Sequence, residues 1–489
     1  MCVVCQAVTA GAALLAGMLP VADAVEQKST PATVEIAVKI ACSKIGQVKT
    51  SQGKTEKCVI ANGKKVWQVV QTKTTTKTTT TKTTTKNTTT TTEPYRDPTV
   101  SSSSQELCRL QDQSYQRRRW GHLIAGFPLI ETNFQASGTF KIALVPIDFG
   151  DLPGESNWRV RVDDQMKLLA DFYDMVSEGR VSMQWQVHDS WVRASGSSDS
   201  FTLDRSRSDN NVLANAAFSA ADPLVNFKDV RAVYFVLPAK QKFLPESVQG
   251  FFHSGFSYLT DEGRIYNYGV AGNFFDREYK NYWTFWAHEM GHMFPLPDLY
   301  DVGSQWWIGK ILAIPGGPFS GFDMMANQDG PTRTLSAWLR FVMGWLSDSQ
   351  VFCKPFSQLG DTQVTLLPID ERTTGLKTVM IPVSDSKLVV IESRRANTKF
   401  DCQGAGTSTA GWRARNGVIV YTADLTLGHG EGFMSLVAPE GRGLQQLSTC
   451  SAPSQLDAIL QTGDSVITNG VKIQVLKSDK YDTIQITKL

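Results

Sequence analysis

The sequence predicts a body of mixed α and β structure, followed by an all-β, sandwich-like C-terminal domain and preceded by a small β-type module on a disordered linker. Three observations predict this fold class. Apolar runs typical of buried strands flank a helical pattern in the body, short strand-like runs recur after residue 349, and residues 72–92 contain only 16 Thr, 4 Lys and 1 Asn. The 489 residues are 42% hydrophobic, which supplies material for several cores and excludes a wholly disordered protein.

The first 24 residues have the pattern of a secretory signal peptide. Residues 8–19 form an apolar stretch of small residues, Pro20 ends it, and Ala22-Asp23-Ala24 fits a cleavage site. A short buried helix is the alternative interpretation. No other stretch reaches the ~18 apolar residues of a membrane span, so we expect a secreted protein with no transmembrane segment.

Residues 25–71 are predicted to form a small module. Strand-like runs at residues 33–41, 58–61 and 66–70, with the turn signal Asn62-Gly63, favour a hairpin. Its surface is rich in lysine, which indicates either association with a cell wall or polyanion, or a solvated face on a tether. Residues 72–104 follow as the linker, because their polar side chains supply no core and the lysines repel one another.

The positive charge is confined to this N-terminal region. Residues 25–92 contain twelve Lys and three Glu, whereas the whole chain has a formal net charge of +2, so the residues after 92 are net negative. Nucleic-acid-binding domains usually concentrate Lys and Arg on a folded face. We therefore expect no nucleic-acid partner.

The body, residues 105–348, alternates between strand and helix patterns. Residues 139–149 and 230–237 are continuous apolar strand runs, residues 181–187 alternate as a strand, and helical spacing of apolar residues covers 160–176 and 212–221. This order predicts helices packed on one sheet.

Residues 349–489 have a different pattern, in which short strand-like runs are separated by polar turns. This spacing predicts a β-sandwich or a jelly-roll-like domain. The runs lie at residues 364–367, 378–383, 388–392, 418–421, 466–467, 471–476 and 484–486.

The cysteines favour disulfides. The chain has 8 Cys, of which Cys2 and Cys5 lie in the signal, and an even number remaining in an exported chain is typical of disulfide pairing. None lies in a CxxC pair, which argues against a cysteine zinc site. If cysteines pair within one candidate domain wherever they can, two local disulfides form and the remaining two cysteines pair across the middle region. The candidate pairs are Cys42 with Cys58, Cys402 with Cys450, and Cys108 with Cys353.

Residues 283–301, WTFWAHEMGHMFPLPDLYD, contain the most informative motif. His288 and His292 are four residues apart, so on a helix both imidazoles lie on one face with the spacing that two zinc ligands need. Glu289 is placed to reach a metal-bound water, and Asp298 can supply a third ligand from beyond the helix. A pair of surface histidines on an ordinary helix is the alternative, but the apolar residues around the pair argue against it.

This segment resembles the zinc motif of the immune inhibitor A-like metalloproteases, a metzincin-like group of secreted endopeptidases. The family pattern HExxHxxGxxD followed by Tyr-Asp matches His288, Glu289, His292, Asp298, Tyr300 and Asp301. Residues 321–325 resemble the family segment whose methionine, here Met325, forms a turn beneath the zinc, and residues 334–346 resemble the helix that follows. The resemblance implies a metzincin-type catalytic domain at 105–348, a β-rich domain at 349–489 and one catalytic zinc ion.

Pro295 departs from this pattern, because the family usually has glycine there. Glycine permits a positive φ, whereas proline is held near φ ≈ −65°. We therefore expect the chain to reach Asp298 through a differently built turn, with Asp301 as the nearest rival ligand.

The chemistry expected of these residues is peptide hydrolysis. Zinc lowers the pKa of its bound water toward ~7, and Glu289 acts as general base. We expect a monomeric, secreted zinc endopeptidase acting on extracellular proteins or peptides. The alternatives are a non-catalytic adhesion or binding protein, and a zinc amidase acting on wall peptides.

The remaining candidates are weaker. Asp298 and Asp301 could instead hold structural calcium, although no EF-hand-like loop is present. The other histidines lack metal-ligand spacing, so we expect structural or exposed roles for them. They are His122, His188, His253 and His429.

Overall fold

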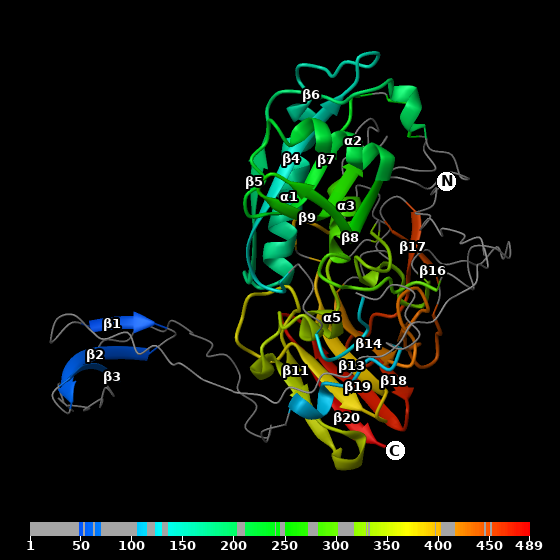
Figure 1. Ribbon diagram of the computed structural model, residues 1–489. Helices are drawn as coiled ribbons and strands as arrows, with labels where there is room; N and C mark the ends of the chain where they lie inside the picture. The colour runs from blue at the N-terminus through cyan, green and yellow to red at the C-terminus, as the bar shows by residue number, and fades with distance from the viewer. Residues whose placement is uncertain are drawn as a thin grey trace, which may run out of the picture. The chain divides into compact units, whose positions relative to one another are not determined.

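The computed structural model divides into a smaller unit within residues 11–95 and a larger unit that includes residues 96–489 (Figure 1). The described residues are 48–51, 54–61, 64–69, 105–114, 123–129, 135–202, 211–239, 241–244, 250–271, 282–301, 317–328, 330, 333–396, 398–401, 416–444, 446–449 and 452–489. The predicted signal peptide and the whole Thr/Lys-rich linker lie outside them.

The smaller unit is a three-stranded antiparallel sheet. Its strands are β1 (Val48–Ser51), β2 (Lys54–Ala61) and β3 (Lys64–Val69), in that order across the sheet. Ala61 pairs with Lys64, so β2 and β3 form the hairpin predicted around residues 62–63. The predicted run at residues 33–41 lies outside the described residues.

The first part of the larger unit is a six-stranded, mostly parallel sheet in the order β5-β4-β7-β9-β8, with β6 also paired to β4. Only the β8–β9 pairing is antiparallel. The strands are β4 (Gly138–Asp148), β5 (Val181–Val187), β6 (Val192–Arg193), β7 (Val230–Val236), β8 (Gly250–Thr260) and β9 (Gly263–Ala271).

Helices pack on this one sheet, as the sequence predicts, and they cover both of its faces. Successive residues of a strand point to opposite sides. In β4, Ile142 and Leu144 share a core with α1 (Arg159–Val176) and α3 (Tyr282–Gly291), whereas Ala143 and Val145 share a separate core with α2 (Asn211–Ala221). The continuous apolar run of β4 follows from burial on both faces.

The second part of the larger unit contains two further sheets, drawn in the lower part of that unit in Figure 1. One has the order β10-β12-β13-β14-β15 and the other the order β11-β20-β19-β18. Their strands are β10 (Val351–Cys353), β11 (Thr362–Leu366), β12 (Thr378–Pro382), β13 (Lys387–Arg394), β14 (Gly417–Asp424), β15 (Met434–Leu436), β18 (Ser465–Thr468), β19 (Val471–Ser478) and β20 (Asp482–Lys488), and a separate pair comprises β16 (Gln446–Thr449) and β17 (Ala452–Leu456).

The five-stranded sheet links the two parts through its two faces. Val389 and Ile391 of β13 pack in the core shared with the four-stranded sheet, as a sandwich requires. Leu388 and Val390 instead belong to the core that also contains α1 and α3. Residues 105–348 and 349–489 therefore share one core inside one compact unit, and their separation into two domains stays a prediction.

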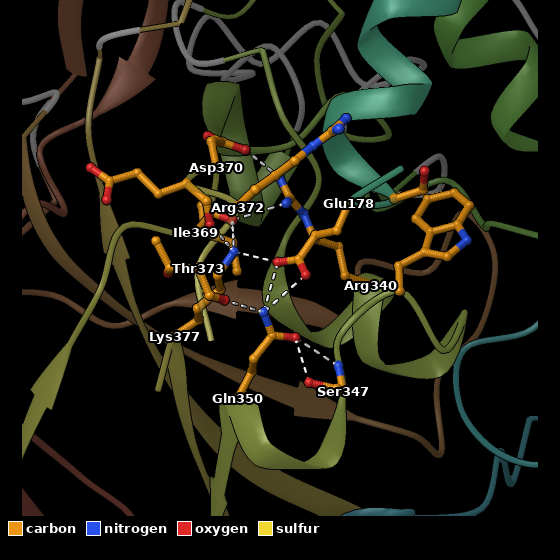
Figure 2. A network of polar contacts seen from close by, with 12 residues as sticks. Glu178, Arg340, Ser347, Gln350, Ile369, Asp370, Arg372, Thr373 and Lys377 are labelled. Atoms are coloured by element: carbon orange, nitrogen blue, oxygen red, sulfur yellow. Dashed lines mark hydrogen bonds and ion pairs between the residues drawn. The ribbon is translucent and has the colours of Figure 1, made fainter. Parts of the chain in front are cut away.

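A buried polar network reinforces this junction (Figure 2). The Lys377 ammonium contacts the Glu178 carboxylate, and Gln350 Nε2 donates to both Glu178 oxygens at 2.9 Å. Nearby, the buried Arg340 guanidinium forms an ion pair with Asp370. Buried charges are tolerated where they are paired and hydrogen-bonded, as they are here.

The Cys108–Cys353 disulfide, the cross-region pair expected from the sequence, also joins the two parts, with a sequence separation of 245. The side chains of Cys42, Cys58, Cys402 and Cys450 lie outside the described residues. Within the described part of the chain, no helix has the length and apolar character needed to cross a membrane.

Candidate metal centre

Helix α3 carries the first four residues of the HExxH motif in the apolar core. Trp283, Trp286 and Met290 are buried on it, and the Tyr173 hydroxyl of α1 donates to the carbonyl oxygen of Ala287 at 2.5 Å. The helix ends at Gly291, so His292 lies in the turn that follows it, where its N–H donates to the Glu289 carbonyl oxygen at 3.2 Å. The two imidazoles still face one another, with ring centroids 5.2 Å apart.

Asp298 lies between these two imidazoles. Its Oδ1 is 3.0 Å from Nε2 of His288 and 3.5 Å from Nε2 of His292. One ligand atom from each of the three residues lies within 4.8 Å of the others. Ligands at ~2.0–2.1 Å from a tetrahedral zinc ion are ~3.4 Å apart, so three side chains at these spacings could hold a metal ion.

Hydrogen bonds fix the tautomers of both histidines. Nδ1 of His288 lies 2.9 Å from the carbonyl oxygen of Met324, and Nδ1 of His292 lies 2.9 Å from that of Leu296. A carbonyl oxygen only accepts, so each Nδ1 carries a proton, and each Nε2 presents a lone pair whenever the ring is neutral. Metal-ligating histidines are oriented in this way.

The two oxygens of Asp298 have different surroundings. Oδ2 accepts a hydrogen bond from the Tyr300 hydroxyl at 2.7 Å, whereas the contact of buried Oδ1 is with Nε2 of His288 at 3.0 Å. Burial opposes ionisation, but the surrounding imidazoles, His292 foremost, outweigh it and hold the pKa of this carboxyl well below its usual range. Against the effect of burial, the hydrogen bond to Asp298 raises the pKa of His288 to about 9, so Oδ1 attracts a cation, either a proton on His288 Nε2 or a metal ion. The donor set therefore fits a metal ion.

Glu289 follows His288 directly on α3 and is partly buried. Burial raises the pKa of Glu289 to about 7, against the opposing charge of His288. A carboxylate general base works best when its pKa lies near the working pH.

The turn to Asp298 contains no residue with positive φ anywhere between 282 and 301, all of which are described. The chain reverses through other contacts: Leu296 N donates to the Gly291 carbonyl oxygen at 3.0 Å, and the Pro295 carbonyl oxygen accepts from Ile124 N at 2.9 Å. Leu299 N donates to Met325 O at 3.1 Å. Pro295 is therefore accommodated without the reversal that glycine would provide.

Met325 lies directly against α3. A Cβ atom on Gly291 would be 2.4 Å from the Met325 Sδ, so a larger residue at 291 would displace the end of this methionine side chain. The Asp323 carboxylate holds the methionine segment, accepting from Met325 N at 2.7 Å and from Ser336 N at 2.6 Å. The same segment provides the Met324 carbonyl oxygen that orients His288.

His429 is the residue that the sequence analysis missed. Its Nδ1 accepts a hydrogen bond from Asp298 N at 3.0 Å, and its ring centroid is 5.8 Å from that of His292. Burial lowers the pKa of this imidazole. A separation of 131 residues hides the contact from motif spacing. The only local signal is the position of His429 between Gly428 and Gly430.

The other candidates do not join this group. Asp301 forms an isolated β-bridge with Glu431, and it is not one of the three residues whose ligand atoms converge. The His188 backbone N–H donates to Leu144 O, and its ring lies outside the group as well. His122 and the side chain of His253 fall outside the described residues. Calcium binding stays a prediction.

Comparison with known proteins gives little further information. No protein-family model matches the chain, and no curated protein matches it. Among solved structures, wild-type OgpA from Akkermansia muciniphila is 10% identical with a TM-score of 0.26, covering 74% of this chain and 97% of that one. Catalytically inactive OgpA in complex with an O-glycopeptide substrate, glycodrosocin, is 10% identical with a TM-score of 0.25, covering 74% and 96%. Similarity at this identity and TM-score assigns no function to this chain.

Proposed function

We propose that this protein is a secreted zinc endopeptidase with a metzincin-like catalytic region. One observation carries the proposal: the side chains of His288, His292 and Asp298 bring their ligand atoms together in a largely buried cluster that adjoins Glu289 in the motif. Sequence alone suggested these four residues, and the hydrogen bonds from Nδ1 of both histidines to carbonyl oxygens, which are typical of metal-ligating histidines, support the proposal independently.

The donor set favours zinc over calcium or magnesium. Two imidazole nitrogens and one carboxylate oxygen suit zinc, whereas calcium and magnesium prefer oxygen ligands throughout. Catalytic zinc sites typically use three protein ligands and leave the fourth position for water or substrate. His288, His292 and Asp298 would be the three protein ligands here.

When bound, zinc would polarise the scissile carbonyl and acidify a water molecule. Glu289 would accept the proton of the attacking water as the new carbon–oxygen bond forms. It would then return that proton to the amine nitrogen as the carbon–nitrogen bond breaks. Tyr300 would hold Asp298 in place through its hydrogen bond to Oδ2.

Secretion is part of the proposal, and the Cys108–Cys353 disulfide supports it. Disulfides persist in oxidising compartments and are rare in the reducing cytosol. Together with the predicted signal peptide, this favours extracellular proteins or peptides as substrates.

The test combines metal analysis with hydrolysis. Wild-type protein should contain about one zinc ion per chain and cleave casein, and a chelator should abolish the cleavage reversibly. Glu289→Gln should retain zinc and lose activity by roughly 10²–10⁴-fold, because it removes the base and keeps the ligands. Glu262→Gln, which changes an exposed carboxylate in the β8–β9 turn, is the matched control.

Three results would contradict the proposal. Full activity in Glu289→Gln would remove Glu289 from its role. Bound zinc with no hydrolysis of casein or peptidoglycan would favour a binding protein. Cleavage of purified peptidoglycan but not casein would favour an amidase.

A further inference from the structure

We propose that His429 is a positioning residue of the metal centre, and that it holds the third ligand, Asp298, without itself binding the metal. This inference rests on the proposed function, since it concerns the same metal site. It assigns part of that site to the β14–β15 connection, which follows the HExxH motif by more than a hundred residues.

The hydrogen bond between Asp298 N and His429 Nδ1 determines the tautomer of His429. A backbone N–H only donates, so Nδ1 must carry a lone pair, and the proton of the neutral ring is on Nε2. This is the opposite of the tautomer of His288 and His292. His429 therefore presents an N–H group to the metal centre, and an N–H group cannot ligate a metal.

The position of Nε2 agrees with this role. It lies 3.6 Å from Asp298 Oδ2, the oxygen that also accepts from Tyr300. The Nε2–H group of His429 therefore lies near Asp298 Oδ2, whereas Asp298 Oδ1 is the oxygen that lies near His288 and His292. His429 contacts the main chain of Asp298 through one ring nitrogen and attracts its carboxylate through the other.

The loop that carries His429 contacts the Asp298 segment at further points. Gly430 N donates to the Asp298 carbonyl oxygen at 3.1 Å, so both peptide groups flanking Asp298 Cα are held by this loop. Asp301 and Glu431 continue the contact as an antiparallel bridge. A Cβ on Gly432, whose φ is +67°, would lie 3.2 Å from Asp301 Cβ, which indicates a close approach.

The loop is itself firmly anchored. Its ends are closed by the hydrogen bond from Asp424 N to Phe433 O at 2.8 Å, and Gly428 N donates to Glu431 Oε2 at 2.8 Å. Gln113 N also donates to Leu425 O at 2.9 Å. The Asp298 segment contains no positive-φ turn, and this anchored loop supplies a restraint from outside the segment.

Three substitutions of His429 distinguish the contribution of its Nδ1 from that of its Nε2. Asn places an amide oxygen near the position of Nδ1 and can accept from Asp298 N, whereas Gln places its amide nitrogen near Nε2 and loses that acceptor. Ala removes both. His188→Ala is the control, because that ring lies outside the ligand cluster.

The measurement is the zinc dissociation constant of the full chain, obtained by competition with a chromophoric chelator. Loss of an outer partner of a metal ligand typically weakens metal binding 10–100-fold. We expect a weakening of this size in His429→Gln and His429→Ala, and affinity close to wild type in His429→Asn and His188→Ala. Near-ultraviolet circular dichroism checks that each variant is folded.

The order of the variants distinguishes positioning from packing. A side chain that only filled space would be replaced better by Gln than by the smaller Asn, so retention of zinc in His429→Gln with loss in His429→Asn would overturn the inference. Unchanged affinity in all three would overturn it as well. If wild-type protein binds no zinc, the proposed function itself fails, which is a different result from an altered order among the variants.

The tautomer gives a second readout that does not depend on activity. The chain has only 6 His, so ¹⁵N-histidine labelling of the zinc-loaded protein should resolve the His429 ring, assigned by its absence in His429→Ala. A proton on Nε2 and none on Nδ1 is expected. The reverse pattern would contradict the inference.

Discussion

The imidazole Nδ1 of His288 lies 2.9 Å from the carbonyl oxygen of Met324, so a loop more than thirty residues further along orients the first histidine of the motif. Asp323 holds that loop through hydrogen bonds from Met325 N and Ser336 N. The next residue, Met325, packs against Gly291 of α3. Residues 323–325 thus orient the candidate ligand His288 and also pack against the helix that carries the motif.

Replacing Asp323 should disturb both roles. A buried hydrogen bond to a charged group contributes about 1.5–3 kcal/mol. Asp323→Ala should therefore lower the free energy of unfolding by at least about 2 kcal/mol and weaken zinc binding through His288. Urea denaturation and chelator competition measure the two effects. Asp361→Ala, an exposed position, is the control, and equal behaviour of the two variants would contradict the role of Asp323.

Asp298→Ala and Asp301→Ala should differ sharply in zinc binding. Asp298 belongs to the converging group and Asp301 does not. The first variant should lose more zinc affinity than the ~10–100-fold typical of outer partners, while the second should keep the metal. Zinc content after dialysis checks this order. The reverse order would move the third ligand to Asp301.

Gly291→Ala should destabilise the protein even though alanine is the better helix former. The new Cβ would lie 2.4 Å from Met325 Sδ, and forcing extra volume into a packed core typically costs about 1–3 kcal/mol. The double variant Gly291→Ala/Met325→Ala should show a favourable interaction energy in a double-mutant cycle of unfolding free energies. If the changes in unfolding free energy of the two single variants simply add in the double variant, there is no steric conflict between residues 291 and 325.

Lys377→Met should cost about 1.5–3 kcal/mol of unfolding free energy, because it removes the buried ammonium that contacts the partly buried Glu178 carboxylate. Adding Glu178→Gln should recover part of the loss. Lys472→Met, which removes an exposed pair with Glu440, should cost less than about 1 kcal/mol. Similar losses in the two single variants would show that the network of Figure 2 contributes no more than a surface pair.

Removing the Cys108–Cys353 disulfide should lower stability by roughly 2–5 kcal/mol, because the bridge closes a long loop in the unfolded chain. Chemical denaturation of Cys108→Ser/Cys353→Ser against wild type measures the loss. Non-reducing peptide mapping should show the bridge directly, and free thiols at both positions would contradict it.

The sequence determined the features that depend on local order. Alternation of apolar and polar residues located β5, and continuous apolar runs located β4 and β7, each within a few residues. These patterns are local because neighbouring residues of a strand face opposite sides of the sheet, so burial of one or both sides determines the residue types along the strand. Helical spacing located α2 within a residue. The spacing of the HExxH motif likewise selected the two histidines whose rings the structure brings together.

Tertiary structure alone decided which distant segments meet. It placed α2 on the opposite sheet face from α1 and α3, merged residues 105–348 and 349–489 around one core, and brought His429 against Asp298. The periodicity of apolar residues indicates that one face of a helix or strand is buried, but it does not indicate which other segment packs on that face. The contact of His429 with Asp298 depends on how β14 and β15 pack against the rest of the unit, and no local pattern near residue 429 encodes that packing.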